Sequence, residues 1–279
     1  MQRKRPATPI PPSGKAAAQT DKAAPTEFER NKLEAIAFQE TIASHVVGIL
    51  THEGQNVGTG TLVRYGTKHL ILTAYHVLEV TPISKVRFAF RPRGSLQTAP
   101  LREFAATPTP LIAGQSIDPL RVGQDKANDL TAVVLRPQQE LPGNAALYDA
   151  TRIKPFQLIE QASLLFTGFP MDNAVQAGPR VEAVGMVSEH SFYDVALNKS
   201  AEVVAKIDPA RQFAMKYTWA GALSPDGFSG SAIWCGLNSS SPIWTANLAL
   251  AGVVTDYDQS KQLIYATNLS RVLALIARS

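Results

Sequence analysis

Residues 58–79 read GTGTLVRYGTKHLILTAYHVLE, and this stretch decides the fold class. It holds two β-rich runs around a polar, glycine-containing turn. Similar short runs stand before and after it, and no helical pattern of useful length separates them. They are VVGIL, KVRFAFR, LTAVVL, SLLFTGF, VEAVGMVS, FAMKYTWAG, SAIW, LALAGVVT and LIYATN. About twelve strands so spaced predict an all-β protein of barrels or sandwiches rather than a parallel α/β sheet.

The two ends of the chain differ from this strand-rich part in composition and pattern. Residues 1–26 are rich in Pro, Ala, Lys and Thr, so they predict a disordered basic leader. Thr26 and Glu29 form a capping-box pattern ahead of an apolar stripe, which predicts a helix over 27–43. The ending NLSRVLALIARS predicts a C-terminal helix capped by Asn268, with an apolar stripe at Val272, Leu273, Leu275 and Ile276. Between the helices we expect two barrels, over 44–150 and 151–279, with insertion-prone loops at 92–125 and 189–212.

Charge and cysteine content narrow the function classes. The first 32 residues hold seven basic and three acidic residues, which accounts for the whole net charge of +4. The neutral body disfavours nucleic-acid binding. No apolar run approaches the roughly 20 residues of a membrane-spanning helix, and no apolar signal segment follows Arg3-Lys4-Arg5. The single cysteine, Cys235, permits no intrachain disulfide, which fits a reducing compartment. We therefore expect a cytoplasmic protein with no membrane partner.

His76 is the first candidate catalytic residue along the chain, since it follows directly on the apolar run LILTAY. Amide hydrolysis by a serine needs a base whose pKa is near neutrality, and histidine is the usual choice. The other histidines, His45, His52, His69 and His190, have no comparable setting, and we interpret them as surface or structural residues.

Asp129 stands immediately before the apolar run LTAVVL, where it can hold the tautomer of a histidine and stabilise its cation. Taken alone, Asp129 is better interpreted as a turn aspartate that caps the bend at Asn128 and Asp129. Asp118 and Asp125 are competitors, but neither directly precedes the run.

Ser229 lies in the segment DGFSGSA, between small residues and ahead of a strand pattern. Gly227 lets the backbone turn without a Cβ clash, so the amides of Gly227 and Ser229 are candidates for an oxyanion hole. Ser224 and Ser231 are alternative nucleophiles, although only Ser229 has both a glycine two residues before it and a glycine after it.

The three segments gain weight from their order, which is His76, Asp129, Ser229, with gaps of 53 and 100 residues. With LTAYHV, DLTAVVL, GFP at 168–170, GFSGSA and AGVVTDY, the chain resembles the chymotrypsin-like serine peptidases of the bacterial type over about residues 45–279. The resemblance implies two six-stranded antiparallel Greek-key barrels. It also implies a catalytic triad of Ser229 as nucleophile, His76 as general base and Asp129 as its partner, without cofactor or metal.

The sequence departs from that family around the triad. Relatives activated by cleavage carry an aspartate before the nucleophile, and Phe228 takes its place. We therefore expect a site that is constitutively formed or gated by another event.

Four residues are assigned to the substrate pocket by the resemblance. They are Leu223, where a trypsin-type pocket has aspartate, Thr255, where a serine supports the triad aspartate, and Tyr257 and Leu263, where glycines line the pocket. Since none offers a buried carboxylate, the sequence predicts cleavage after small or apolar residues rather than Arg or Lys. Asp226 and Asp256 are assigned to the rim.

The leading hypothesis is a serine endopeptidase that forms an acyl-enzyme on a protein or peptide substrate. This hypothesis includes gating of the site, either by the substrate or by a regulatory protein that contacts the N-terminal segment. The alternative is a catalytically silent binding module on the same fold. The intact triad positions count against it, whereas Phe228 and the bulky pocket positions keep it open. A third hypothesis makes the basic leader a nucleic-acid tail, and the neutral body weighs against it.

Overall fold

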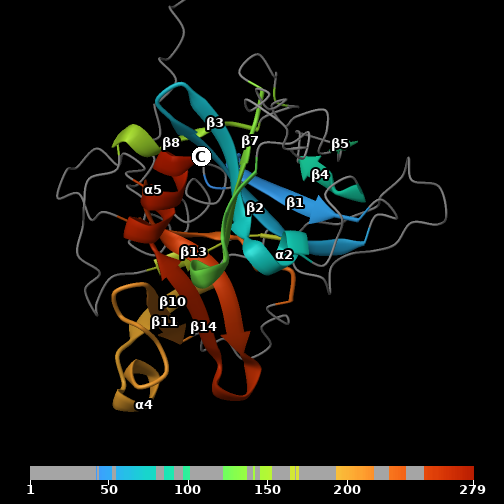
Figure 1. Ribbon diagram of the computed structural model, residues 1–279. Helices are drawn as coiled ribbons and strands as arrows, with labels where there is room; N and C mark the ends of the chain where they lie inside the picture. Colours follow the sequence, from blue (N-terminus) through green and yellow to red (C-terminus); the bar gives the residue numbers. More distant parts are fainter. Residues whose placement is uncertain are drawn as a thin grey trace, which may run out of the picture.

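The computed structural model describes residues 42, 44–51, 55–79, 85–90, 97–100, 122–136, 141, 145–152, 164–166, 168–169, 193–216, 226–236 and 248–279. Over these residues the chain is mostly β-strand with a few short helices, and every strand pair but one is antiparallel. Figure 1 shows two groups of strands, one built from the first half of the chain and one from the second. The predicted leader and N-terminal helix lie outside the described residues, apart from Ile42.

The first half forms one sheet. Its strands are β1 (Val46–Leu50), β2 (Asn56–Tyr65), β3 (Lys68–Ala74), β4 (Arg87–Phe90), β5 (Gln97–Pro100), β6 (Val122–Asp125), β7 (Leu130–Val134) and β8 (Tyr148–Asp149). They follow the order β5-β4-β1-β2-β3-β7-β6, and β8 pairs parallel with β2. Its short helices are α2 (Tyr75–Glu79), η2 (Lys126–Asn128) and η3 (Ala150–Arg152). The described strands follow an open path, so the closure of a first barrel stays a prediction.

The second half forms a closed barrel of six strands in the order β10-β11-β14-β13-β12-β9. Their bounds are β9 (Leu164–Phe166), β10 (Tyr193–Asn198), β11 (Gln212–Lys216), β12 (Ala232–Gly236), β13 (Leu248–Asp258) and β14 (Leu263–Asn268). The remaining helices are α4 (Ala201–Val204), η5 (Gln259–Lys261) and α5 (Leu269–Arg278). The interior is apolar and includes Phe166, Phe213 and Ile233, which explains the β-rich runs of the sequence.

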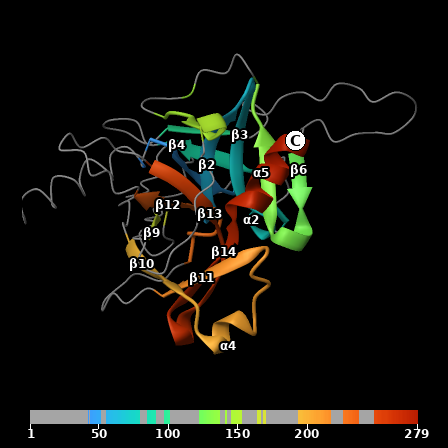
Figure 2. The ribbon, with the colours of Figure 1, turned by 90° about the vertical axis from the view of Figure 1, so that its left-hand side faces the viewer.

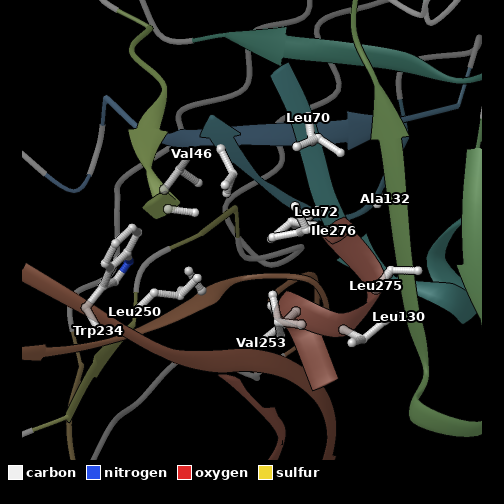
Figure 3. Close-up of a cluster of buried hydrophobic side chains, with 14 of the residues drawn as sticks. Val46, Leu70, Leu72, Leu130, Ala132, Trp234, Leu250, Val253, Leu275 and Ile276 are labelled. Atoms are coloured by element: carbon white, nitrogen blue, oxygen red, sulfur yellow. The ribbon is translucent and has the colours of Figure 1, made fainter. Parts of the chain in front are cut away.

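The helix α5 joins the two halves. Asn268 caps it as predicted, because its Oδ1 accepts a hydrogen bond from Arg271 N. Val272, Leu275 and Ile276 are buried in one cluster with residues of β1, β3 and β7 on one side and β12 and β13 on the other, as Figure 3 shows. Burying each of these side chains contributes about 1.5–3 kcal/mol. The helix also lies beside β6, which is visible in Figure 2.

Two regions predicted to be loops contain regular structure. The range 92–125 contains β5 and β6, and the range 189–212 contains β10 and α4. Among the described strands β6, which reads VGQD, pairs with β7 only, and none of its residues is buried. It therefore lacks the alternation of apolar and polar residues that a sequence pattern could reveal. None of the helices among the described residues is both long enough and apolar enough to cross a membrane.

Candidate active site

His76 and Asp129 meet at the ends of two neighbouring strands. His76 is the second residue of α2, which follows β3 directly, and Asp129 precedes β7. Because β3 and β7 are paired up to Ala74 and Leu130, the two side chains emerge side by side. His76 Nδ1 lies 2.8 Å from Asp129 Oδ2, and the backbone N–H of His76 donates to Asp129 Oδ1 at 3.0 Å. The carboxylate therefore fixes both the ring and the main chain of His76.

The surroundings of His76 favour its protonated form. The hydrogen bond to Asp129 raises the pKa of the imidazole above its ordinary value, while burial partly opposes this. The negative charges of Asp129, Asp256 and Glu79 raise the pKa further. With Nδ1 turned to the carboxylate, the neutral ring has its Nε2 available as a proton acceptor on the opposite side.

The loop that carries Ser229 is held by a strand of the first half of the chain. The backbone N–H of Thr59 in β2 donates to Ser229 O at 2.8 Å, and its hydroxyl donates to Gly227 O at 2.7 Å. The same hydroxyl accepts from Phe169 N at 3.0 Å. All of these groups except Ser229 are buried, so the strand and the loop exclude water from the contact.

Gly230 makes the closest approach between this loop and the strand that leads to His76. A Cβ on Gly230 would lie 2.0 Å from Thr59 O and 2.2 Å from Thr73 Oγ1, and the residue has a φ of +92°. The hydroxyl of Thr61 extends the contact, donating to Gly230 O at 3.4 Å and accepting from Ala232 N at 3.0 Å. Glycine is thus required both by its conformation and by the lack of space.

Gly58 shows that the His76 helix and the Ser229 loop are neighbours. A Cβ at Gly58 would lie 2.7 Å from the side chain of Val77, the residue after His76, and 3.1 Å from Ser229 O. Within the described part of the chain, no hydrogen bond joins Ser229 Oγ to His76. Hydrogen bonds between catalytic groups are often long before substrate binds, so the lack of this bond does not by itself argue against a joint role of Ser229 and His76.

The backbone of residues 227–230 leaves specific donors unused. The four carbonyls of this loop accept hydrogen bonds, from Thr59 Oγ1, Ser231 N, Thr59 N and Thr61 Oγ1 in chain order. Gly230 N donates to Val254 O. Among the hydrogen bonds of the described residues, none uses the N–H of Gly227 or of Ser229. Gly227 has a φ of +90°, a conformation that glycine adopts without strain.

Phe228 anchors the loop from behind. Its side chain is 1% exposed and packs edge-on against Phe166, with ring centroids 5.1 Å apart. Apolar burial therefore occupies the position where cleavage-activated relatives of the resembled family would have an ion pair, and it contributes about 2–3 kcal/mol to the folded loop.

The competing candidates have other contacts. Asp125 Oδ2 is paired with Arg278, and Ser231 is fully buried, so neither meets His76. His45 is half-buried, donates from Nδ1 to Ala146 O at 2.7 Å and packs against Trp234, which agrees with a structural role. Asp118 and Ser224 lie outside the described residues.

The assigned pocket residues do not form one group. Tyr257 packs with the barrel interior, and its hydroxyl hydrogen-bonds Asp226, directly before Gly227. Leu263 faces the other side of the sheet, since Tyr257 is paired with Ile264 instead. There Leu263 lines a hollow of about 280 Å³ together with Lys206, Lys216 and Lys261. Leu223 lies outside the described residues.

Thr255 does not support Asp129 in the way that the resemblance implied. Its hydroxyl donates to Tyr265 O at 3.4 Å, and Thr267 instead donates to the carbonyl of Asn128, the residue before Asp129, at 2.7 Å. Sequence reasoning missed Thr267 and the hydroxyls of Thr59 and Thr61. The alternation Gly-Thr-Gly-Thr at 58–61 was a signal for the latter pair, because small residues there permit close docking.

Comparisons with known proteins found no family model and no curated protein that matches the chain. Among the described residues, no group of three or more His, Cys, Asp or Glu side chains could hold a metal ion. The chemistry of the site is therefore inferred from its own geometry.

Replacing Gly230 by alanine should destabilise the protein strongly, because the new methyl group would clash with Thr59 O and Thr73 Oγ1. We expect the free energy of unfolding to fall by more than about 3 kcal/mol. Gly66→Ala is the matched control, since Gly66 also has a positive φ but nothing lies within 4 Å of its Cβ position. It should cost about 1 kcal/mol in urea titrations. Equal losses for the two variants would contradict the docking of the loop.

Asp129→Asn should lower the pKa of His76, which can be followed by NMR of the imidazole protons. Because the folded state raises that pKa, His76 contributes stability that is fully present below about pH 6.5 and is lost as the pH rises through the folded value. The variant should lack this loss. Glu79→Gln, which removes a more weakly acting charge, should change the titration less. An unchanged titration in Asp129→Asn would refute the pairing.

Proposed function

We propose that this chain is a serine endopeptidase in which Ser229 attacks the peptide carbonyl, His76 acts as general base and acid, and Asp129 orients His76. The observation that carries the proposal is the contact between His76 Nδ1 and Asp129 Oδ2 at 2.8 Å. Beside this pair lies the Ser229 loop. Among the hydrogen bonds of the described residues, none uses the Ser229 hydroxyl or the N–H groups of Gly227 and Ser229. Acyl transfer needs this set of groups.

Proton transfer would follow from the orientation of the ring. Neutral His76 donates through Nδ1 to Asp129 and takes the Ser229 hydroxyl proton at Nε2 as Oγ bonds to the substrate carbonyl carbon. His76 then gives that proton to the leaving amine, which releases the first product and leaves an acyl-enzyme. Water, activated by the same ring, hydrolyses the ester. The N–H groups of Gly227 and Ser229 would stabilise the oxyanion in both halves of the reaction.

A free strand edge supports an extended peptide as the substrate. The strand β13 pairs with β12 only as far as Val253, and its next residue bonds the Ser229 loop through Ser231 and Gly230. From Asp256 to Asp258, β13 pairs with β14 on one side, and no described strand covers the other edge. A peptide added to this edge would reach Ser229 directly.

One donor on that edge is occupied by a side chain of the protein itself. The N–H of Tyr257 donates to Asp256 Oδ1 at 2.8 Å. A substrate carbonyl would replace the carboxylate there, which then moves into solvent. Since Asp256 also raises the pKa of His76, substrate binding and the protonation of His76 are linked through this residue.

The buried Phe228 supports a loop that is formed before any cleavage event. Gating by a regulatory protein at the N-terminal segment remains our proposal from the sequence, and that segment lies outside the described residues. The alternative is a catalytically silent binding module, and labelling by a fluorophosphonate probe separates it from the enzyme.

Fluorophosphonate probes should label the protein at Ser229, because they react with activated serine hydroxyls. Ser229→Ala should abolish labelling and reduce peptidase activity by at least about 10³-fold. Ser260→Ala, at an exposed serine that bonds Asp258, is the matched control and should label like the wild type. Labelling should increase with pH around a midpoint above 6.5, because only neutral His76 is a base and its pKa is raised.

The absence of labelling in the wild-type protein over pH 6–10 would reject the enzyme in favour of the binding module. Labelling that persists in Ser229→Ala would reject the assigned nucleophile.

A peptide library should show cleavage after small or apolar residues. The carboxylate nearest to the loop, Asp226, is engaged by the Tyr257 hydroxyl, and the wall residue Tyr257 is bulky. A basic side chain therefore lacks a free carboxylate partner on this wall. Dominant cleavage after Arg or Lys would contradict this specificity, although it would leave the triad intact.

A further inference from the structure

Asp129 adopts a backbone conformation that an ordinary residue avoids. Its φ and ψ are 48° and 49°, in the left-handed region, and Gln262 is the other non-glycine residue with a positive φ in the described part of the chain. Such a conformation persists when neighbouring contacts determine it. The contacts that determine it therefore decide whether the carboxylate faces His76.

Two of these contacts come from the second half of the chain. Arg278, in the last turn of α5, places Nη2 2.8 Å from Asp125 Oδ2, and the Asp125 side chain is 12% exposed. Thr267, at the end of β14, donates to Asn128 O at 2.7 Å in a fully buried contact. Asp125 is the residue before η2, Asn128 is the last residue of η2, and Asp129 is its C-cap.

Asp125 connects Arg278 of α5 to the turn that carries Asp129. Burial alone would raise the pKa of its carboxyl group, but hydrogen bonds from Asn128 and Arg278, with the charge of Arg278, lower it below the usual range. The carboxylate thus stays ionised and bonded to both residues at neutral pH. It joins α5 to the turn that ends at Asp129.

The opposite side of η2 is held by the helix of His76. Lys126 Nζ lies 3.3 Å from Glu79 Oε1 and 5.5 Å from the centre of the Tyr75 ring. The N–H of Tyr75 donates to Asp129 O at 3.1 Å. The turn is therefore held between α2 in the first half and α5 with β14 in the second.

We propose that Arg278 and Thr267 are positioning residues that hold Asp129 in its left-handed conformation and thereby orient His76. We call the two contacts, Arg278 with Asp125 and Thr267 with Asn128, the latch. As a statement about catalysis the inference rests on the proposed function, but its effect on His76 can be measured without any reaction. Through the latch, the geometry of the His76–Asp129 pair depends on the docking of α5.

The sign of a pKa change separates this role from simple electrostatics. Removing the positive charge of Arg278 would by itself raise the pKa of a nearby histidine. Loosening Asp129 would lower the pKa of His76, because the hydrogen bond to Asp129 is the largest cause of its elevation. The other charged groups around His76 are Asp256, Glu79 and Lys126, and the variants leave all three in place.

The test uses Arg278→Ala and Thr267→Val in the full chain, each with and without Ser229→Ala. The pKa of His76 is measured by NMR in the Ser229→Ala background, and fluorophosphonate labelling rates are measured with Ser229 present. Both variants should lower the pKa of His76 and slow labelling about 10- to 100-fold. Thr267→Val changes no charge and little volume, so its effect is purely positional. Arg278→Lys should restore most of the labelling rate.

Lys68→Ala is the matched control, because Lys68 Nζ bonds Ala277 O at the same end of α5 without touching η2. It should leave the titration of His76 unchanged. The inference is overturned if Arg278→Ala and Thr267→Val leave the pKa of His76 unchanged or raise it, whether or not they lower Tm. If the wild-type chain fails to label but the pKa of His76 still falls in both variants, the latch stands and the proposed function does not.

Discussion

The site depends on the docking of the Ser229 loop onto the strand β2. Thr59 uses its N–H, its hydroxyl and its carbonyl at once, bonding the loop, residue 169 and the hydroxyl of Thr73. These bonds are made in a dry interface, where an unmade bond would leave a buried polar group without a partner. The loop therefore has one favourable position, and that position sets where Ser229 stands relative to the helix of His76.

Apolar packing supplies the stability that this polar contact requires. The cluster in Figure 3 draws side chains from both halves of the chain and from α5, so burial of these side chains couples the barrel to the first sheet. The candidate catalytic groups stand at the seam, with the His76–Asp129 pair on the sheet and Ser229 on the barrel. A seam held by a common core can keep three groups in register although the longest gap between them is 100 residues.

The sequence pointed to the candidate catalytic residues more clearly than to the elements and contacts around them. His76 and Asp129 each end or begin an apolar run, and such positions project from strand ends, so their meeting followed from strand order. The strand β10 and helix α4 were missed because their segment lacks a long apolar pattern and depends on its barrel neighbours. Leu263 was assigned to a pocket by position alone, and a strand places successive side chains on opposite faces. The roles of Thr267 and Arg278 depend on contacts between residues more than 130 positions apart, which no local pattern encodes.

The pairing of Asp256 with the N–H of Tyr257 has a consequence for how the protein behaves in a crowded solution. A free strand edge can pair with the same edge of another copy and start aggregation, and natural proteins place charges on such edges to prevent it. Asp256 puts a carboxylate on the donor that such pairing would need. Two copies that approached edge to edge would bring like charges together, whereas a peptide from another protein would not. Under the proposed function Asp256 is the residue that a substrate would displace, and its charge would also disfavour the pairing of two copies at this edge.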